Sequence, residues 1–340
     1  MKDIKDLSLK ELEGVFTGLA EERFHSRQVY AWIYKKGLTD FKAMSNLAVG
    51  LRRALAKEFF ISSLCVTEKL TSIDGTQKLL LKLKDGNSIE AVIIPAENRV
   101  TGCISTQAGC RYACNFCASG MNGFKRNLAP GEIIEEVLLA KKNSAENRLT
   151  HLVFMGTGEP LDNYDNLLKA IRIINSPDGL NIGSRRMTIS TCGIIPGIQR
   201  LAQEGIQVEL SVSLHASDDK TRSSLMPVNK IYPLKELLAS CRSYIAKTNR
   251  QITFEYVLIK GINSDLQNAK KLTTILKGLN CKVNLIACNP ATNLKTQAAG
   301  KLEALIFKDC LLKSGINATL RKSRGLDIAA ACGQLKYEAK

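Results

Sequence analysis

No apolar run in this 340-residue sequence approaches the length of a membrane-spanning helix, and its first residues, Met1-Lys-Asp-Ile, are polar. We therefore expect neither a signal peptide nor a membrane anchor, which favours a cytoplasmic protein. Histidine is scarce, with only His25, His151 and His215, so a His-rich metal site is not expected. Aromatic residues make up 6% while hydrophobic residues make up 45%, a balance typical of a globular protein.

Acidic residues are also few relative to basic ones. The 32 Asp and Glu face 48 Lys and Arg, which gives a formal net charge of +16. An excess of this size favours a polyanionic partner, although a solvated basic surface is the alternative. The charge is dispersed in pairs such as Arg52-Arg53, and the densest short stretch is Arg321-Lys322-Ser323-Arg324. Such dispersion suits a broad docking surface on folded nucleic acid better than a basic tail. Phosphate contacts alone specify no base sequence.

The eleven cysteines, in a chain without an export signal, indicate a reducing compartment, and an odd number cannot be fully paired. Cys110, Cys114 and Cys117 have the spacing C-x3-C-x2-C. A structural zinc site needs four ligands, and ordinary iron–sulfur clusters are held by four thiolates. Three thiolates leave one iron of a [4Fe–4S] cluster free for an exogenous chelator. This spacing resembles the motif of the radical S-adenosylmethionine (SAM) enzymes, in which SAM binds that iron. A zinc knuckle completed by a distant cysteine, or a chance cluster of buried thiols, remains open.

The first 60 residues are predicted to be helical. Ser8 and Glu11 form a capping-box pattern before an apolar periodic segment, and residues 47–59 carry a second apolar face. The period then changes, because Leu79–Lys84 and Ile89–Ile94 flank Asp85-Gly86, which predicts a β-hairpin. We predict three parts: a helical accessory domain at 1–60 that contacts RNA, a hairpin linker at 61–98 and a barrel at 99–340.

From about Val100 onward, strands and helices alternate, which predicts a parallel sheet covered by helices. The candidate strands are Val100–Ser105, Leu149–Met155, Met187–Thr191, Val208–Ser213, Ile252–Leu258, Lys282–Ala287 and Ala318–Lys322, with helices such as Glu132–Lys142 and Tyr164–Ile174 between them. Six or seven repeats allow either an incomplete barrel or an open doubly wound sheet. Glycine, serine, histidine and cysteine residues follow successive strands at one end, as in barrel enzymes, so we favour an α/β partial (β/α)6 barrel.

Four segments of the sequence resemble the RlmN/Cfr family of RNA adenine methyltransferases. They are CISTQAGCRYACNFC (Cys103–Cys117), GFKRNL (Gly123–Leu128), GTGEPL (Gly156–Leu161) and AACGQL (Ala330–Leu335). The resemblance runs from about residue 90 to 335 and is weaker through the N-terminal helices. Thr157 stands where methionine is usual and Cys192 where serine is commoner, and neither change removes a known functional group.

The resemblance implies a radical SAM enzyme that methylates an adenine carbon, which is too unreactive for polar methyl transfer. Two SAM molecules are used per turnover. One methylates Cys332, and the other is cleaved at the [4Fe–4S] cluster to a 5′-deoxyadenosyl radical that takes hydrogen from this methyl group. The carbon radical then adds to adenine. Cys103 helps to resolve the crosslink, which ends in a transient Cys103–Cys332 disulfide. That bond requires Cα atoms within about 7 Å.

The same resemblance assigns the site residues. Glu90 is the expected proton acceptor, and its place on an apolar strand face could raise its pKa, although an exposed sheet edge is the alternative. The cluster ligands are expected to be Cys110, Cys114 and Cys117. The SAM-binding residues are expected to be Gly158, Glu159, Ser190, Ser213, Leu214, His215 and Asn289. Without the resemblance, Cys332 and Cys103 read as small buried residues, or Cys103 as a fourth cluster ligand, and His215 as a core histidine.

We therefore expect methylation at adenine C2 in 23S rRNA, and at the adenine beside the anticodon in some tRNAs. The alternatives are a Cfr-like C8 methyltransferase that confers antibiotic resistance, a zinc-stabilised RNA-binding protein, and a radical SAM enzyme acting on a protein or small molecule. The expected partners are 23S rRNA, tRNA and an electron donor such as flavodoxin. We expect a monomer without membrane association.

Overall fold

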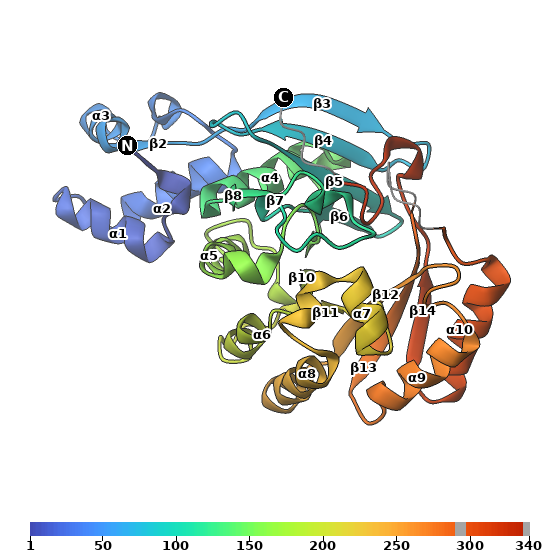
Figure 1. Ribbon diagram of the computed structural model, residues 1–340. Coiled ribbons are helices and arrows are strands. Elements are labelled where there is room, and N and C mark those ends of the chain that lie inside the picture. The colour runs from blue at the N-terminus through green and yellow to red at the C-terminus, as the bar shows by residue number, and fades with distance from the viewer. Residues whose placement is uncertain (290–296, 336–340) are drawn as a thin grey trace.

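The computed structural model describes residues 1–289 and 297–335. A single ten-stranded sheet runs through most of the molecule in the order β14-β13-β12-β11-β10-β9-β6-β5-β4-β3 (Figure 1). Neighbouring strands from β14 to β6 are parallel, whereas those from β6 to β3 are antiparallel. The sheet therefore has a parallel part and an antiparallel part that meet at β6.

The parallel part consists of seven strands in chain order. They are β6 (Arg99–Cys103), β9 (His151–Phe154), β10 (Met187–Thr191), β11 (Glu209–Ser213), β12 (Ile252–Leu258), β13 (Cys281–Ala287) and β14 (Asn317–Arg321). The helices between them are α4 (Pro130–Asn143), α5 (Tyr164–Asn175), α6 (Ile195–Leu201), α7 (Asp219–Leu225), α8 (Leu234–Thr248), α9 (Leu266–Leu276) and α10 (Lys301–Lys313). A doubly wound sheet would reverse its strand order at a switch point. No reversal occurs among these strands, so the predicted partial barrel is confirmed.

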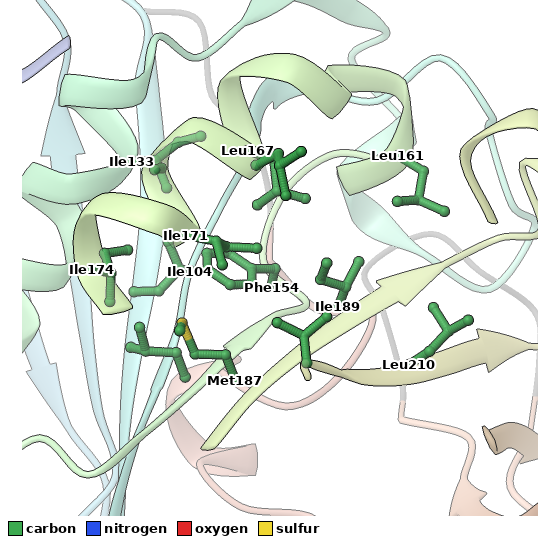
Figure 2. Packing of buried hydrophobic residues seen from close by; sticks show 14 of the residues in the cluster. Ile104, Ile133, Phe154, Leu161, Leu167, Ile171, Ile174, Met187, Ile189 and Leu210 are labelled. Atoms are coloured by element: carbon green, nitrogen blue, oxygen red, sulfur yellow. The ribbon is translucent and has the colours of Figure 1, made fainter. Parts of the chain in front are cut away.

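The main core lies between the parallel strands and their covering helices. Ile171 of α5 lies beside Phe154 of β9, and Ile133 of α4 belongs to the same cluster; all three side chains are fully buried (Figure 2). Apolar residues on α5 recur at helical spacing on the face that it turns to the sheet, as expected for a helix covering parallel strands. Burial of this apolar face holds the helices against the strands, and this packing determines where the C-terminal ends of the strands lie.

The antiparallel part consists of β3 (Cys65–Thr71), β4 (Gln77–Lys82) and β5 (Ser88–Ala96). The predicted hairpin around Asp85-Gly86 is confirmed, with β4 and β5 as its strands. The sequence did not predict β3, nor that β5 pairs with β6 and so joins the hairpin to the main sheet. The boundaries at residues 60 and 98 stay a prediction.

The N-terminal residues form a small helical region that packs against α4. Its helices are α1 (Leu9–Gly18), α2 (Phe24–Tyr30) and α3 (Val49–Glu58), and a short parallel pair joins β1 (Lys2–Asp3) to β2 (Phe59–Phe60). The predicted capping box is present, since Glu11 Oε2 accepts the Ser8 N–H at 2.7 Å and Ser8 Oγ accepts the Glu11 N–H at 3.3 Å. The buried Lys5 ammonium pairs with Glu135 of α4, which ties this region to the barrel. Among the described residues, no helix has the length and apolar character to cross a bilayer.

Candidate active site

A cavity with about 1020 Å³ of empty space, part of it open to solvent, lies where the parallel strands end. Most of the residues singled out from the sequence line this one cavity: Cys110, Cys114, Cys117, Gly158, Glu159, Ser190, Ser213, His215, Asn289 and Cys332. They come from loops that follow different strands, as expected for a site at the C-terminal end of a barrel. Leu214 does not line it, because its side chain is fully buried in the main core.

A short hairpin holds the cysteine loop. β7 (Gln107–Gly109) pairs antiparallel with β8 (Phe124–Asn127), and the Cys110 N–H donates to the Gly123 carbonyl at 3.2 Å. Gly109 has φ +74°, and a Cβ there would lie 1.9 Å from the Gly123 carbonyl oxygen. Only glycine fits this close approach, which allows the two strands to lie close together where the cysteine loop begins and ends.

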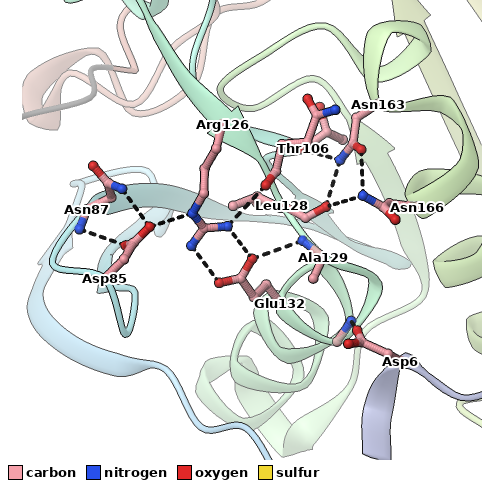
Figure 3. A network of polar contacts seen from close by, with 12 residues as sticks. Asp6, Asp85, Asn87, Thr106, Arg126, Leu128, Ala129, Glu132, Asn163 and Asn166 are labelled. Carbon is pink, nitrogen blue, oxygen red and sulfur yellow. Dashed lines mark hydrogen bonds and ion pairs between the residues drawn. The ribbon is translucent and has the colours of Figure 1, made fainter. Parts of the chain in front are cut away.

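Arg126 of β8 anchors the same hairpin to its surroundings (Figure 3). Its guanidinium donates to both oxygens of Glu132 at 2.7 and 2.8 Å, and its Nε donates to Asp85 at 2.5 Å. Bidentate pairing of this kind fixes both partners in orientation. The network joins α4, the β4–β5 turn and the cysteine loop, so all three are held in one arrangement.

Cys110, Cys114 and Cys117 lie on one loop and line one cavity. Within residues 1–289 and 297–335, no three His, Cys, Asp or Glu side chains lie close enough to hold one metal ion. In a cubane cluster each thiolate binds a different iron, so the sulfurs surround the cluster and do not converge on one point. Burial raises the pKa of the Cys110 thiol to about 12, so a bound cation is needed to keep it as a thiolate. Three thiols on one loop are the donor set that a [4Fe–4S] cluster with one free iron requires, whereas a structural zinc ion would need a fourth ligand.

Glu159 lies in the wall of the cavity, after β9. Burial raises the pKa of its carboxyl group, while backbone N–H groups of Cys192 at 2.6 Å and Leu161 at 3.0 Å favour the ionised form. A carboxylate oxygen has two lone pairs, so each oxygen can still accept a bond from a cationic ligand. Gly158 has φ +106°, and a Cβ there would lie 2.5 Å from Gln107. The loop therefore brings backbone as well as carboxylate to the cavity.

His215 follows β11 and is held in one tautomer. Its Nδ1 accepts the Val257 N–H at 3.0 Å, so the ring proton is on Nε2. Burial and the nearby Arg222 cation lower the pKa of His215 to about 3, which keeps the ring neutral. The ring also meets Phe116 of the cysteine loop edge-on, with centroids 4.7 Å apart. His215 is thus both a satisfied buried histidine and a neutral N–H donor in the cavity wall.

Sequence reasoning missed Arg222, which is fully buried in α7. Its guanidinium donates to the carbonyl oxygens of Cys192 at 2.7 Å, Ser213 at 3.2 Å and Leu214 at 3.2 Å. These bonds join the loops after β10 and β11, and so position two walls of the cavity. Nothing in the local sequence distinguishes it from a surface arginine.

Cys103 and Cys332 both line a second cavity that adjoins the first. Cys332 is exposed and lines both cavities, whereas Cys103 is buried at the end of β6 and lines only the second. Burial raises the pKa of the Cys103 thiol to about 12, and Cys332 adds to this rise. All eleven cysteines fall within the described ranges and none forms a disulfide. The fold thus brings together two thiols 229 positions apart, and Cys117 of the cysteine loop lines the second cavity with them.

Glu90 lies in β5 and lines neither cavity. It is 7% exposed and pairs with Lys78 of β4 at 3.0 Å, which excludes the exposed-edge alternative. It shares a strand face with Val92, which packs against Cys103 and the residues around Cys332. Sequence reasoning missed Lys78, whose ammonium is the partner of this buried carboxylate.

The chain matches the family model described as the Radical SAM superfamily over residues 104–272. It also matches the model described as the ribosomal RNA large subunit methyltransferase N-terminal domain over residues 2–61. It is 44% identical over 337 residues to the probable dual-specificity RNA methyltransferase RlmN of Thermoanaerobacter sp. (strain X514), covering 99% of this chain and 98% of that protein. The same identity holds over 342 residues to the protein of that name from Geobacillus kaustophilus, covering 100% and 94%.

The fold also resembles a solved structure. A radical SAM methyltransferase from Sphaerobacter thermophilus superimposes with a TM-score of 0.95 and is 43% identical, covering 98% of this chain and 99% of that one.

Proposed function

Because this chain belongs to the RlmN family of radical SAM RNA methyltransferases, we propose that it methylates C2 of an adenine in 23S rRNA and of the adenine beside the anticodon in some tRNAs. Its relatives carry the name of dual-specificity RNA methyltransferases, and the similarity extends over the N-terminal domain. These findings favour the C2 enzyme over the Cfr-like alternative. The single observation that carries the proposal is Cys332, which lines both the cavity of the cluster cysteines and the cavity of Cys103.

Radical SAM enzymes use a [4Fe–4S] cluster and SAM, and in our proposal Cys110, Cys114 and Cys117 hold the cluster. When bound, it supplies the electron for the radical chemistry that an unreactive adenine carbon requires. Glu159 would accept a hydrogen bond from the SAM ammonium group, and the Nε2–H of His215 would donate to a SAM oxygen. Gly158, Ser190, Ser213 and Asn289 complete this wall, and Leu214 would act through its backbone alone.

Cys332 carries the methyl group in this proposal. Its thiolate attacks the methyl carbon of one SAM, so that a new S–CH3 bond forms while S-adenosylhomocysteine leaves. The methyl carbon later becomes bonded to adenine. Cys103 then attacks Cys332 sulfur, which releases the RNA and leaves a disulfide between the two cysteines. A dithiol reductant must supply two electrons and two protons before the next turnover. The second cavity supports this role, since Cys103 and Cys332 both line it.

Glu90 would take the proton that leaves adenine C2. Its carboxylate pairs with Lys78, which fixes the position of the oxygen atoms that would accept the proton. Its strand face leads directly to Cys103 and the residues around Cys332.

The net charge of +16 supports RNA as the substrate and an acidic protein such as flavodoxin as the electron donor. The helical region at 1–60 would contact RNA beside the barrel, and the enzyme would act as a monomer.

Label transfer from methyl-deuterated SAM tests the proposal. Under anaerobic conditions, mass spectrometry should find label first on the Cys332 peptide and then on 2-methyladenosine from 23S rRNA and tRNA. Cys332→Ala should abolish both signals. Cys288→Ala should retain both, because Cys288 lines the same cavity but has no assigned role. Label on 8-methyladenosine alone would establish the C8 alternative, and label in neither RNA would overturn the proposal.

A further inference from the structure

The turn between β3 and β4 lies against the segment that leads to Cys332. In Figure 1, the red segment after β14 lies beside the end of β3 and β4, although more than 250 residues separate them in sequence. This segment, residues 324–329, follows β14 and ends three residues before Cys332. The contact therefore joins the outermost antiparallel strands to the proposed methyl-carrying loop.

Two aspartates form a reciprocal pair of contacts across this junction. Asp327 accepts the Ser72 hydroxyl at 2.5 Å and the Ile73 N–H at 3.1 Å. In return, Asp74 of the turn accepts the Gly325 N–H at 3.1 Å. Each segment thus supplies a carboxylate that satisfies a backbone donor of the other. Hydrogen bonds to a charged acceptor are about twice as strong as neutral ones.

The ionisation of both carboxylates agrees with these contacts. Hydrogen bonds from Ser72 and from the Ile73 amide lower the pKa of Asp327. Burial opposes ionisation of Asp74, but hydrogen bonds from Thr76 and Gly325 lower its pKa to about 2. Both groups therefore stay charged acceptors at neutral pH.

The packing around Gly325 leaves little freedom. Its φ of +64° is in the left-handed region, and a Cβ there would lie 2.9 Å from both Thr76 and Ala330. Lys78 of β4 adds a contact from its ammonium to the Ala329 carbonyl at 3.3 Å. The approach to Cys332 is thus held on the antiparallel side by backbone, side-chain and steric contacts.

The other side of Cys332 is held by the parallel part. The Gly333 carbonyl accepts the Ala118 N–H at 2.8 Å, and Asn289 Nδ2 donates to the Cys332 carbonyl at 3.0 Å. The Leu335 carbonyl accepts the Ser119 hydroxyl at 2.9 Å. The chain is therefore held by hydrogen bonds on both sides of Cys332. One set of contacts lies beside the proposed cluster cysteines, and the other lies on the β3–β4 turn.

We propose that Asp74 and Asp327 are positioning residues, which hold the Cys332 loop so that its sulfur stays within reach of both Cys103 and the SAM cavity. This inference rests on the proposed role of Cys332. Neither aspartate touches the reacting atoms, so each acts through the loop. Loss of the pair frees one end of the loop and lowers the effective concentration of Cys332 at Cys103.

The test uses the full-length, cluster-loaded protein under anaerobic conditions. The variants are Asp327→Ala, Asp74→Ala and their double, with Asp309→Ala as the matched control. Asp309 is also an exposed aspartate with a partner, Lys313 at 2.7 Å, but it lies on α10. Equilibration with glutathione redox buffers measures the Cys103–Cys332 disulfide, in which one oxidised glutathione becomes two thiols for each bond formed. The double variant should need about tenfold more oxidising buffer, as expected for loss of hydrogen bonds to charged groups.

Amide hydrogen exchange supplies a second readout that does not depend on activity. Exchange in residues 325–335 should be about tenfold faster in the double variant and unchanged in α8. Asp327→Asn keeps one acceptor oxygen and should lie between wild type and Asp327→Ala. In turnover, kcat should fall while the KM for RNA stays constant. If the alanine variants fail to fold, Ser72→Ala removes one donor to Asp327 and asks the same question.

The outcomes separate the two proposals. A disulfide that forms equally well in wild type and the double variant, with equal exchange, overturns the positioning role. A wild-type protein that forms no such disulfide in any buffer counts against the proposed function instead.

Discussion

The parallel and antiparallel parts of the sheet contribute to the site in different ways. The parallel part presents loops at its C-terminal edge, and these loops carry the cysteines proposed to hold the cluster and the residues proposed to bind SAM. The antiparallel part contributes a strand face with Glu90 and a turn that contacts the approach to Cys332. The match to the Radical SAM superfamily spans 104–272 and so leaves out Glu90, Cys103 and Cys332. The three proposed cluster ligands and the proposed SAM-binding residues other than Asn289 lie inside that span, whereas the residues proposed for methyl transfer lie outside it.

The largest effect on activity should come from removing the Glu90 carboxylate, which lies in the antiparallel part of the sheet. Glu90→Gln should lower kcat for RNA methylation by about 100-fold or more, because a positioned general base typically contributes that much. SAM binding and iron content, which belong to the parallel part, should not change. Rapid-quench assays and equilibrium dialysis measure the two properties separately.

Glu97→Gln is the control for this variant, since Glu97 follows β5 directly and is exposed. Equal activity in Glu90→Gln and wild type would contradict the proposed role of Glu90, and with it the part that the antiparallel strands play in the reaction.

A smaller effect, on stability, should come from crowding the parallel part. A Cβ on Gly156 would lie 2.6 Å from Ser105 Oγ and 2.7 Å from backbone atoms of Ile104 and Ser105. Gly156→Ala should therefore lower the free energy of unfolding by about 1–3 kcal/mol. Denaturant titration measures this change.

Gly50→Ala should change the free energy of unfolding in the opposite direction. Gly50 lies in α3 with open space where a Cβ would stand, so alanine there should stabilise the protein by roughly 0.5–1 kcal/mol. A loss of stability in both variants would refute the steric argument.

The smallest effect should be a change in how steeply the free energy of unfolding depends on pH, because the buried carboxyl groups of the two parts have different surroundings. Glu90 has Lys78 as a partner, whereas burial raises the pKa of Glu136 in α4 well above its ordinary value. Folding then favours the protonated form of Glu136, and this contribution is complete below about pH 4.5. It is lost as pH rises toward the folded pKa.

Glu136→Gln cannot ionise, so its stability should fall less steeply than that of wild type above pH 4.5. Parallel denaturant titrations between pH 5 and 8 compare the slopes. Identical slopes would show that Glu136 does not bind a proton on folding.

The sequence predicted local features well. Met187–Thr191 and Ile252–Leu258 match the observed strands at both ends, because continuous runs rich in β-branched residues are typical of buried parallel strands. The cysteine spacing and the glycine loop around Glu159 likewise identified residues that share one cavity.

Contacts between distant segments were not predictable in this way. Lys78, Arg222 and Asp327 look like ordinary surface residues in the sequence, and their roles depend on partners brought close only by folding. Ser72 and Asp327 are 255 positions apart, so no local period reports their contact. Leu214 was grouped with its neighbours by motif, although the alternation of side chains along the chain turns it into the core.

The Lys78 ammonium touches both the Glu90 carboxylate and the Ala329 carbonyl. In an attempt to retarget this enzyme to another nucleobase, one substitution at Lys78 would therefore change both contacts at once. A replacement of Lys78 would remove a contact of the proposed proton acceptor and a contact of the segment that leads to Cys332, so library design should vary Lys78 together with both neighbours.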